Sequence, residues 1–264
     1  MSLEKPIVMG IINLTPDSFY ENSRKLTEKK LLGTCEKMLY EGAEIIDIGG
    51  YSSRPGAPLV NEEEEARRTL KSIALLHNHF KEIILSIDTT RNNIARQAIE
   101  NGAAIINDIS AGEDDFQMLT TAASLQVPLI MMHKKGTPQT MQQLTNYEDV
   151  TEEVLEYFAA KLISPPSLNI HDIIIDVGFG FAKNTTQNYQ LLSALDRFKI
   201  FQKPIMVGLS RKKMIQNVIQ SDAGNALNGT SAAHTISLLK GANILRVHDV
   251  KEAIECIKIV GMLN

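Results

Sequence analysis

Four polar residues close to the ends of apolar segments have the side chains needed to bind a flat nitrogen heterocycle. Asp88, Asn107 and Asp176 each follow residues rich in isoleucine, and Lys212 comes shortly after another apolar run. Carboxylate and amide oxygens accept hydrogen bonds from an amino group beside a ring N–H, and an ammonium group donates to a ring carbonyl or imine nitrogen. Side chains that would flank the faces of such a ring, or equally pack in the core, are Phe179, Phe181 and Met132.

A second group of residues has the types expected at a phosphate or diphosphate site. Arg246 and His248 end the last apolar segment, and Ser53 and Arg54 follow the second one. Arginine binds phosphate oxygens through paired N–H groups, although such basic residues also form ordinary surface ion pairs. Asn13 ends the first apolar segment. Its side chain offers a neutral oxygen to Mg²⁺, an ion that usually keeps several waters and binds through substrate phosphates.

Each of these polar residues also has a structural interpretation. Asp and Asn are common helix N-caps, and a buried polar group can belong to an internal hydrogen-bond network. A carboxylate directly after three isoleucines, as at position 176, costs free energy in an apolar interior unless a partner satisfies it. Both interpretations stay open for the polar residues at the segment ends, which are Asn13, Asp47, Asp88, Asn107, His133, Asp176, Ser210, Arg246 and His248.

Eight short apolar segments must position these residues. Their apolar side chains are nearly continuous rather than alternating, which is typical of strands buried on both faces of a parallel sheet. Segments of helical period separate them, among them 27–40, 61–80, 92–101 and 250–262. The predicted strands span residues 6–13, 44–50, 82–89, 104–110, 127–133, 172–178, 204–210 and 242–248.

Strand-then-helix units in one uninterrupted series predict an α/β protein with a single (β/α)8 TIM barrel. The alternative is a doubly wound open sheet, which usually has fewer strands and often a glycine-rich phosphate turn after the first. No such turn follows Asn13 and no linker divides the chain, so we expect one domain over residues 1–264. Gly-Ala pairs at 42–43, 102–103 and 241–242 predict left-handed helix ends before strands. In a TIM barrel, chemistry occurs where the strands end.

Composition argues against several other classes of protein. The 264 residues include 27 basic and 31 acidic side chains, a formal net charge of −4, whereas nucleic-acid-binding domains are usually basic. Hydrophobic residues make up 44% and charged residues 22%, as in an ordinary globular protein. Cys35 and Cys256 stand alone, so neither a disulfide framework nor a structural zinc site is expected. Without a membrane-span or signal-peptide pattern, we expect a cytoplasmic enzyme.

Seven segments, in order from the first predicted strand to the last, resemble the signatures of dihydropteroate synthases. They are MGIINLTPDSF (9–19), GAEIIDIGGYSSRPG (42–56), SIDT (86–89), IINDIS (105–110), DVGFGFAK (176–183), GLSRK (208–212) and ILRVHDV (244–250). A single match of this kind arises by chance far more readily than seven in the same order. The resemblance therefore covers the whole chain.

The resemblance implies a transferase of folate biosynthesis that joins p-aminobenzoate to 6-hydroxymethyl-7,8-dihydropterin diphosphate and releases diphosphate. It also implies a Mg²⁺ ligand at Asn13, a homodimer and sensitivity to sulfonamide-type inhibitors. The implied pterin contacts are Asp88, Asn107, Asp176 and Lys212, with Phe181 at the ring. The implied contacts to the rest of the substrate are Ser53, Arg54, Arg246 and His248. Catalysis is assigned to Asp88, Lys212, Arg246 and His248.

The chain departs from the usual family pattern at four positions. Tyr51 stands before Ser-Ser-Arg-Pro where Glu-Ser-Thr-Arg-Pro is typical, Val177 replaces a proline, and Ala182 replaces a glycine. Lys213 occupies the place of a serine that helps to bind the aminobenzoate carboxylate. Lys213 either replaces that serine as a cation or points outward and leaves backbone N–H groups to bind the carboxylate. These departures concern substrate binding rather than the activity itself.

Two other functions are compatible with parts of the sequence. A pterin-binding methyltransferase, which passes a methyl group from a methyltetrahydrofolate to a corrinoid protein, has a similar Asp/Asn pocket. It does not need the segments NLTPDSF (13–19), SSRPG (52–56) and RVH (246–248), which are all present. A catalytically idle pterin-binding relative would have lost residues such as Asn13, Lys212 or Arg246, and none is lost. Release of diphosphate in the presence of p-aminobenzoate separates the synthase from both.

Overall fold

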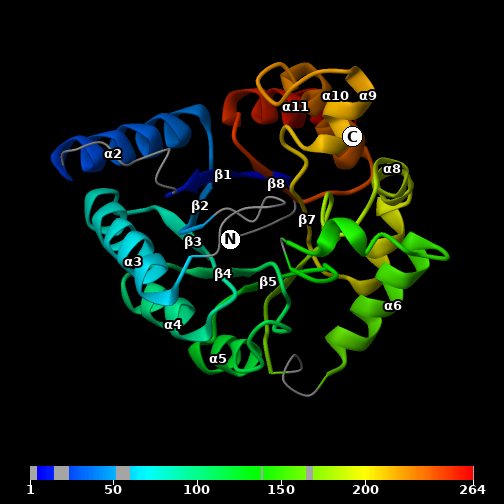
Figure 1. Ribbon diagram of the computed structural model, residues 1–264. Helices are drawn as coiled ribbons and strands as arrows, with labels where there is room; N and C mark the ends of the chain where they lie inside the picture. Colours follow the sequence, from blue (N-terminus) through cyan, green and yellow to red (C-terminus); the bar gives the residue numbers. More distant parts are fainter. Residues whose placement is uncertain (1–4, 15–23, 52–59, 138, 165–168, 264) are drawn as a thin grey trace.

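The protein folds as a closed barrel of parallel strands. The computed structural model describes residues 5–14, 24–51, 60–137, 139–164 and 169–263. In these residues the strands β1 to β8 follow one another in sequence order, and β1 pairs with both β2 and β8. Figure 1 shows the helices arranged around the outside of the strands. The fold is therefore the (β/α)8 barrel that the sequence predicts.

The strands are short and the helices vary in length. The strands are β1 (Ile7–Asn13), β2 (Ile45–Gly49), β3 (Ile84–Asp88), β4 (Ile105–Asp108), β5 (Leu129–Met132), β6 (Ile173–Asp176), β7 (Ile205–Val207) and β8 (Ile244–Val247). The α-helices are α2 (Arg24–Glu41), α3 (Glu62–His79), α4 (Asn92–Glu100), α5 (Met118–Leu125), α6 (Val150–Leu162), α8 (Thr185–Ser193), α9 (Lys213–Ile219), α10 (Leu227–Leu239) and α11 (Val250–Gly261). Two 3₁₀ helices are η1 (Met141–Gln143) and η2 (Leu195–Phe201).

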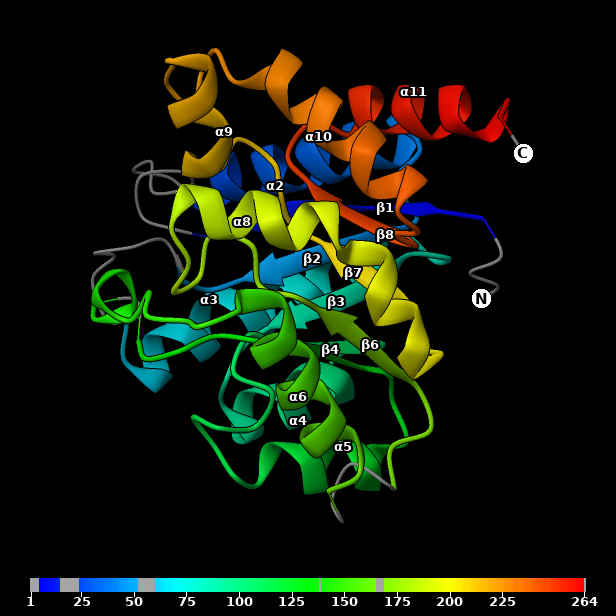
Figure 2. The same cartoon turned by 90° about the vertical axis from the view of Figure 1, so that its right-hand side faces the viewer.

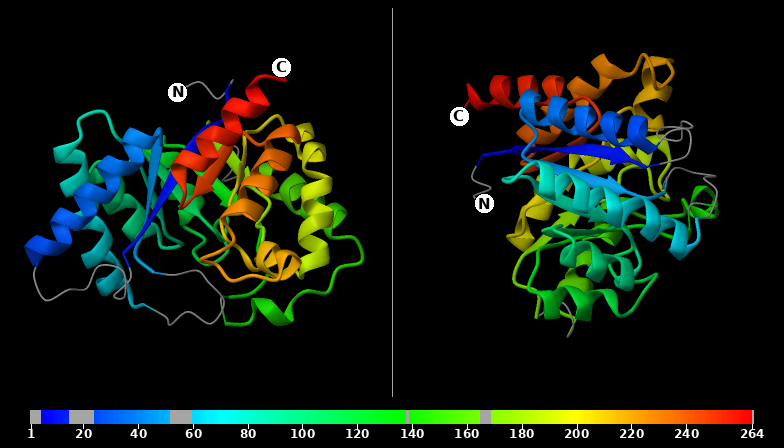
Figure 3. Two further views of the ribbon diagram at one scale, coloured as in Figure 1. Left: turned by 90° about the horizontal axis from the view of Figure 1, so that it is seen from above. Right: turned by 90° about the vertical axis from the view of Figure 1, so that its left-hand side faces the viewer.

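The views from the side show how the helices cover the barrel. Helices α10 and α11 pack side by side on its outer surface (Figures 2 and 3). Within the described ranges, no helix combines the length and the apolar character that a membrane crossing requires.

Each predicted strand contains an observed strand, but several observed strands end earlier. Strand β4 was predicted to continue to Ser110 and stops at Asp108. The Asp108 carboxylate accepts hydrogen bonds from the backbone N–H groups of Ser110 (2.8 Å) and Gly112 (2.7 Å), which turns the chain away from the sheet. The polar residue that ends the apolar run is thus also what stops the strand.

Three helices end in the same glycine turn, as the Gly-Ala pairs predict. Gly42, Gly102 and Gly241 have φ angles of 107°, 108° and 95°, a region that favours a residue without Cβ. The alanine after each glycine donates its N–H to a carbonyl five residues earlier, at 2.9 to 3.0 Å. This is the hydrogen bond of a Schellman-type helix end, and it directs the chain into β2, β4 and β8.

Alternate side chains of the strands fill the inside of the barrel, because successive strand residues point to opposite faces. The residues between them, such as Ile46, Leu85 and Ile106, pack against the helices in a separate outer core. The inside of the barrel is occupied by a buried cluster that we call the inner apolar layer: Ile7, Met9, Ile45, Ile105, Ile130, Ile174, Met206 and Ile244.

Candidate functional site

A polar layer lies one step beyond the inner apolar layer, towards the C-terminal ends of the strands. Two residues after Ile45, Ile105, Ile130, Ile174 and Ile244, strand alternation points the next side chains to the same inner face. Together with Asp88 at the end of β3, we call these side chains the rim layer: Asp47, Asp88, Asn107, Met132, Asp176 and Arg246. All but Arg246 are at most 6% exposed. The site residues expected at the strand ends are thus concentrated at one end of the barrel.

Arg246 joins two carboxylates of the rim layer. Its Nε donates to Oδ2 of Asp47 and a terminal nitrogen donates to Oδ2 of Asp88, both at 2.7 Å. The amide nitrogen of Asn107 donates to the same oxygen of Asp47 at 3.0 Å. The sequence places Asp47 among the polar residues at the segment ends and assigns it no specific contact, whereas its position two residues after Ile45 predicts that it faces the inside of the barrel. The network brings together residues from β2, β3, β4 and β8.

The charges of this network respond differently to burial. Burial raises the pKa of Asp88 to about 7, against the opposing effect of Arg246, and nearby Asp47 raises it further. Burial lowers the pKa of Arg246, but the Asp47 and Asp88 carboxylates outweigh it, so that this pKa is raised. Arg246 therefore stays cationic, whereas Asp88 changes its charge near neutral pH.

The turn after β6 holds Asp176 and requires a glycine. Oδ1 of Asp176 accepts the backbone N–H of Gly178 at 2.8 Å. Gly178 has a φ of 73°, and a Cβ at this position would lie 1.9 Å from the carbonyl oxygen of His133. Burial raises the pKa of Asp176, while Lys212 and this hydrogen bond oppose the shift. Further along the turn, Ala182 has a φ of 50°, in the left-handed region that favours glycine, which is the residue expected at this position from the resemblance described above.

Lys212 lies against the same turn. Its Nζ donates to the carbonyl oxygen of Phe179 and stands 4.6 Å from the centroid of the Phe181 ring. Burial lowers the pKa of Lys212 to about 8, with Asp176 opposing the shift and Arg246 adding to it. Phe179 is a fully buried core residue, whereas Phe181 packs with Met132 in a small separate cluster. Of the two aromatic candidates, Phe181 is the one whose ring contacts a site residue.

Lys183 is a buried residue near the site to which the sequence assigned no role. Its Nζ lies 2.9 Å from Nδ1 of His133 and donates to the carbonyl oxygens of Gly178 (3.0 Å) and Phe181 (3.1 Å). Burial lowers the pKa of His133 to about 2, so its neutral ring can accept a hydrogen bond from Nζ of Lys183. Burial also lowers the pKa of Lys183 to about 7. The signal in the sequence that could have identified Lys183 is its place at the end of the glycine-rich apolar segment 177–182.

The turns after β7 and β8 are joined by a serine and a histidine. The hydroxyl oxygen of Ser210 lies 3.0 Å from Nδ1 of His248, and the backbone N–H of His248 donates to the same oxygen at 3.3 Å. These two contacts hold the imidazole ring beside the end of β7. Of the residues proposed for the diphosphate, Arg246 contacts the rim carboxylates and His248 contacts Ser210.

Asn13 ends β1, and its side-chain oxygen lies beside a glycine of β2. A Cβ on Gly49, the paired residue of β2, would stand 3.2 Å from Oδ1 of Asn13, so a larger residue would crowd this atom. Among the described residues no cluster of three or more His, Cys, Asp or Glu side chains could hold a metal by itself. A single neutral oxygen fits Mg²⁺, because that ion is usually bound through few protein ligands and substrate phosphates.

Two residues expected at the site, Ser53 and Arg54, lie outside the described residues. Just before them, Tyr51 is half-buried, and burial together with Asp88 and Glu65 raises the pKa of its hydroxyl. Lys213, the first residue of α9, is exposed, which agrees with the alternative in which it points outward.

Comparison with known proteins shows to which class of enzyme this chain is similar. Residues 9–248 match the pterin binding enzyme family. The chain is 38% identical over 262 residues to the dihydropteroate synthase of Escherichia coli (strain K12), which covers 98% of this chain and 92% of that protein. A crystal structure of the Yersinia pestis dihydropteroate synthase with a sulfonamide drug complex has a TM-score of 0.91 and 35% identity, covering 100% of this chain and 96% of that one. The Xanthomonas albilineans dihydropteroate synthase with 4-aminobenzoic acid has a TM-score of 0.91 and 34% identity, covering 100% and 94%.

The protein is a pterin-binding enzyme, because the family matches most of its length and its closed (β/α)8 barrel carries buried carboxylate and amide groups at the strand ends. The similarity to individual proteins extends over nearly the whole chain and identifies one family of such enzymes. The chain belongs to the dihydropteroate synthase family.

Proposed function

We propose that this chain condenses p-aminobenzoate with 6-hydroxymethyl-7,8-dihydropterin diphosphate. The amine nitrogen forms a bond to the methylene carbon of the pterin, the bond from that carbon to the diphosphate oxygen breaks, diphosphate leaves, and the nitrogen releases one proton to solvent. The enzyme is a transferase of folate biosynthesis. The observation that carries the proposal is the rim layer, in which buried acceptors of β3, β4 and β6 lie at one end of a barrel similar to dihydropteroate synthases throughout.

The acceptors of the rim layer suit a pterin ring. Oδ1 of Asn107 is buried without a hydrogen-bond partner among the described residues, and so is Oδ1 of Asp47. Such atoms cost free energy unless a ligand satisfies them. In this proposal the pterin amino group and ring N–H donate to Asp176, Asn107 and Asp88. Lys212 donates to the ring carbonyl or imine nitrogen, and Phe181 flanks the ring.

The leaving diphosphate would be bound at the ends of β1 and β8. Arg246 and His248, together with Ser53 and Arg54, supply donors and positive charge for it. Asn13 would hold Mg²⁺, which supplies positive charge to the diphosphate when bound. The pairing of Arg246 with Asp47 and Asp88 fixes the orientation of its guanidinium before substrate arrives. Fixed donors aimed at developing charge are an effective way to stabilise a transition state.

The proposed mechanism separates opposite charges between two parts of the site. The electron-rich pterin ring helps to expel the diphosphate, so positive charge develops on the ring. Ionised Asp88, at the end of β3, stabilises that charge, while Arg246 and His248 stabilise the negative charge on the leaving group. The aromatic amine is already nucleophilic, and we assign no general base. Positioning of the two substrates supplies the rest of the acceleration.

The direct test is turnover by the purified chain. With pterin diphosphate, p-aminobenzoate and Mg²⁺, we expect stoichiometric formation of dihydropteroate and diphosphate, and no diphosphate release when p-aminobenzoate is omitted. A sulfonamide should compete with p-aminobenzoate. The matched control is the Arg197→Lys enzyme, which alters an exposed ion pair with Glu152 and should retain full activity. A folded protein that binds pterin and releases no diphosphate would contradict the proposal.

We also propose that the chain forms a homodimer through helices α10 and α11. Apolar side chains are exposed on this surface, with Ile236 at 44%, Leu239 at 56% and Ile259 at 65%. Ile257 of α11 is partly buried and packs against the core, so it is not part of this exposed surface. Sedimentation should give a dimer for the chain and a monomer for Leu239→Glu. A monomer at micromolar concentration would contradict this proposal.

We propose further that residues 1–264 form one domain located in the cytoplasm. Cys35 and Cys256 are both buried and unpaired with one another, as expected in a reducing compartment. A single cooperative unfolding transition and retention of a fluorescent fusion in the cytoplasmic fraction would support both parts. Two separate transitions or export of the fusion would contradict them.

A further inference from the structure

Arg211 lies between two residues of the site and has a strained backbone. Its φ is 55°, in the left-handed region that residues with a Cβ rarely adopt. On one side Ser210 contacts the ring of His248, and on the other Lys212 contacts the turn that follows β6. Such a conformation persists only where the surrounding structure holds it in place.

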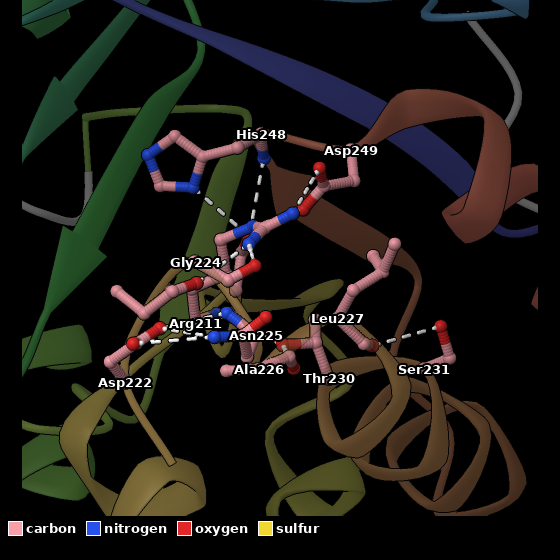
Figure 4. A network of polar contacts seen from close by, with 12 residues as sticks. Arg211, Asp222, Gly224, Asn225, Ala226, Leu227, Thr230, Ser231, His248 and Asp249 are labelled. Carbon is pink, nitrogen blue, oxygen red and sulfur yellow. Dashed lines mark hydrogen bonds and ion pairs between the residues drawn. The ribbon is translucent and has the colours of Figure 1, made fainter.

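The side chain of Arg211 connects three separate segments of the chain (Figure 4). Its Nε and one terminal nitrogen donate to the two carboxylate oxygens of Asp249 at 2.7 and 2.9 Å. The other terminal nitrogen donates to the carbonyl oxygens of Ala223 (2.6 Å) and Gly224 (2.7 Å) in the loop between α9 and α10. The guanidinium is therefore occupied by protein acceptors, although the basic sequence around it would suit a substrate anion.

The backbone of Arg211 is held as well. Its N–H donates to the hydroxyl of Thr230, a residue of α10 that is 1% exposed, at 3.0 Å. Its carbonyl oxygen accepts from the side-chain amide of Gln216 at 2.7 Å. The turn that carries Lys212 is thus attached to α9 and α10 through the backbone of Arg211, and to the residue after β8 through the Arg211 side chain.

Asp249, the carboxylate partner of Arg211, gives a second indication that the Arg211–Asp249 ion pair is not an ordinary surface contact. It occupies the residue before α11, where an aspartate normally caps the helix, yet its side chain makes no capping hydrogen bond. Both of its oxygens bind Arg211 instead, and this pairing lowers the pKa of Asp249. The carboxylate therefore remains ionised throughout the pH range in which the enzyme would work.

We propose that the Arg211–Asp249 ion pair is a positioning device that sets the distance between Lys212 and His248. Lys212 would bind the pterin and His248 the leaving diphosphate, so this inference rests on the proposed function. Neither Arg211 nor Asp249 contacts substrate in this proposal. When the pair is broken, each half of the site still binds its part of the substrate, but the two halves are no longer held in register. A misplacement of about 1 Å can reduce a rate by about 100-fold.

The test uses two conservative variants and their combination. Arg211→Lys keeps the charge and loses the two parallel hydrogen bonds, and Asp249→Asn keeps the shape and loses the charge. For each we expect kcat to fall by about 10- to 100-fold, with KM for both substrates and the affinity for dihydropteroate within about threefold of the parent. The double variant should be no slower than the slower single variant, because both changes remove the same interaction.

The matched control and the parent enzyme separate the possible failures. Arg197→Lys alters the exposed Arg197–Glu152 pair between η2 and α6 and should leave kcat unchanged. If the parent chain forms no dihydropteroate, the proposed function fails rather than this inference. If the parent is active, the inference is overturned by variants with parental kcat. It is also overturned by losses that multiply in the double variant, or by losses accounted for entirely by a lower folded fraction. Each single variant tests the ion pair by itself. If one of the two variants does not fold, the other variant still decides the question.

Discussion

The inner apolar layer and the rim layer share the strands β2, β4, β5, β6 and β8, where their residues stand two apart, and they have opposite properties. The inner layer consists of Ile and Met side chains that satisfy one another by packing. The rim layer buries Asp47, Asp88 and Asp176 nearly as completely, with Arg246 partly buried beside them, and each of these groups needs a charged or polar partner. Strand alternation makes the two layers neighbours, so that the first packs the inside of the barrel while the second brings together the groups that we propose bind the substrate.

This difference shows how the barrel can hold a costly set of charges. Burial of several carboxylates in one layer lowers stability unless partners compensate, and Arg246 compensates only two of them. The apolar layer directly below is a source of stability that does not depend on the ligand. Changes in the two layers should therefore have separable effects on folding and on function.

The largest effect is expected for Arg246→Gln. Removal of the guanidinium leaves Asp47 and Asp88 buried without their common partner, and breaking such a buried pair costs about 3–5 kcal/mol of stability. Loss of a fixed donor to the leaving group should also reduce kcat by about 100- to 1,000-fold. Urea unfolding and steady-state kinetics measure the two effects. Adding Asp47→Asn should restore part of the stability and none of the activity; recovery of activity would remove Arg246 from the diphosphate site.

The next largest effect should be on stability alone. Ile174→Ala removes a side chain of the inner apolar layer that is 4% exposed, and should lower the free energy of unfolding by about 2–5 kcal/mol. Because Ile174 does not belong to the rim layer, the kcat of the folded fraction should stay within about twofold. Chemical denaturation and active-site titration measure both. A large change in kcat at unchanged stability would erase the distinction between the layers.

Asp176→Asn, two residues along the same strand, should show the reverse pattern. The amide presents an N–H group to a pterin donor, which leaves buried polar atoms unpaired at about 1–3 kcal/mol each. Calorimetric titration with a pterin should therefore show roughly 5- to 150-fold weaker binding. Ile174→Ala is the matched control, since it lies on the same strand and should bind pterin normally once folded. Unchanged pterin affinity in Asp176→Asn would remove this residue from the pocket.

The smallest effect concerns pH. The raised pKa of Asp88, about 7, means that it becomes protonated and loses its negative charge below that pH. The lowered pKa of Lys212, about 8, means that it becomes neutral above that pH. We expect kcat/KM for the pterin diphosphate to rise up to about pH 7 and to fall above about pH 8, because this parameter reports the free enzyme.

The Lys212→Arg variant sharpens the pH experiment. Arginine stays charged over the accessible range, so the alkaline limb should move upward while the acidic limb stays in place. An alkaline limb that remains near pH 8 in this variant would assign it to another group or to the substrate.

Most of the barrel was predictable from sequence because its signals are local. Continuous apolar segments identify buried parallel strands, and glycine after a helix identifies its end, as at Gly42 and Gly241. Prediction was poorer for strand ends, where Asp108 turned β4 away two residues early. The candidate site was predictable as a set of residues at strand ends, but its contacts were not.

Sequence by itself determined the order of the strands, the residues available at their ends and the resemblance to one enzyme family, since each depends on neighbours in the chain. Only the tertiary structure decided that Arg246 pairs with Asp47 across 199 residues, that Lys183 contacts His133, and that Arg211 pairs with Asp249. The physical reason is closure of the barrel. Side chains from β2 and β8 become neighbours only when β1 and β8 meet, the turns after β5 and β6 or β7 and β8 only when those strands pair, and burial then determines which charges must find partners.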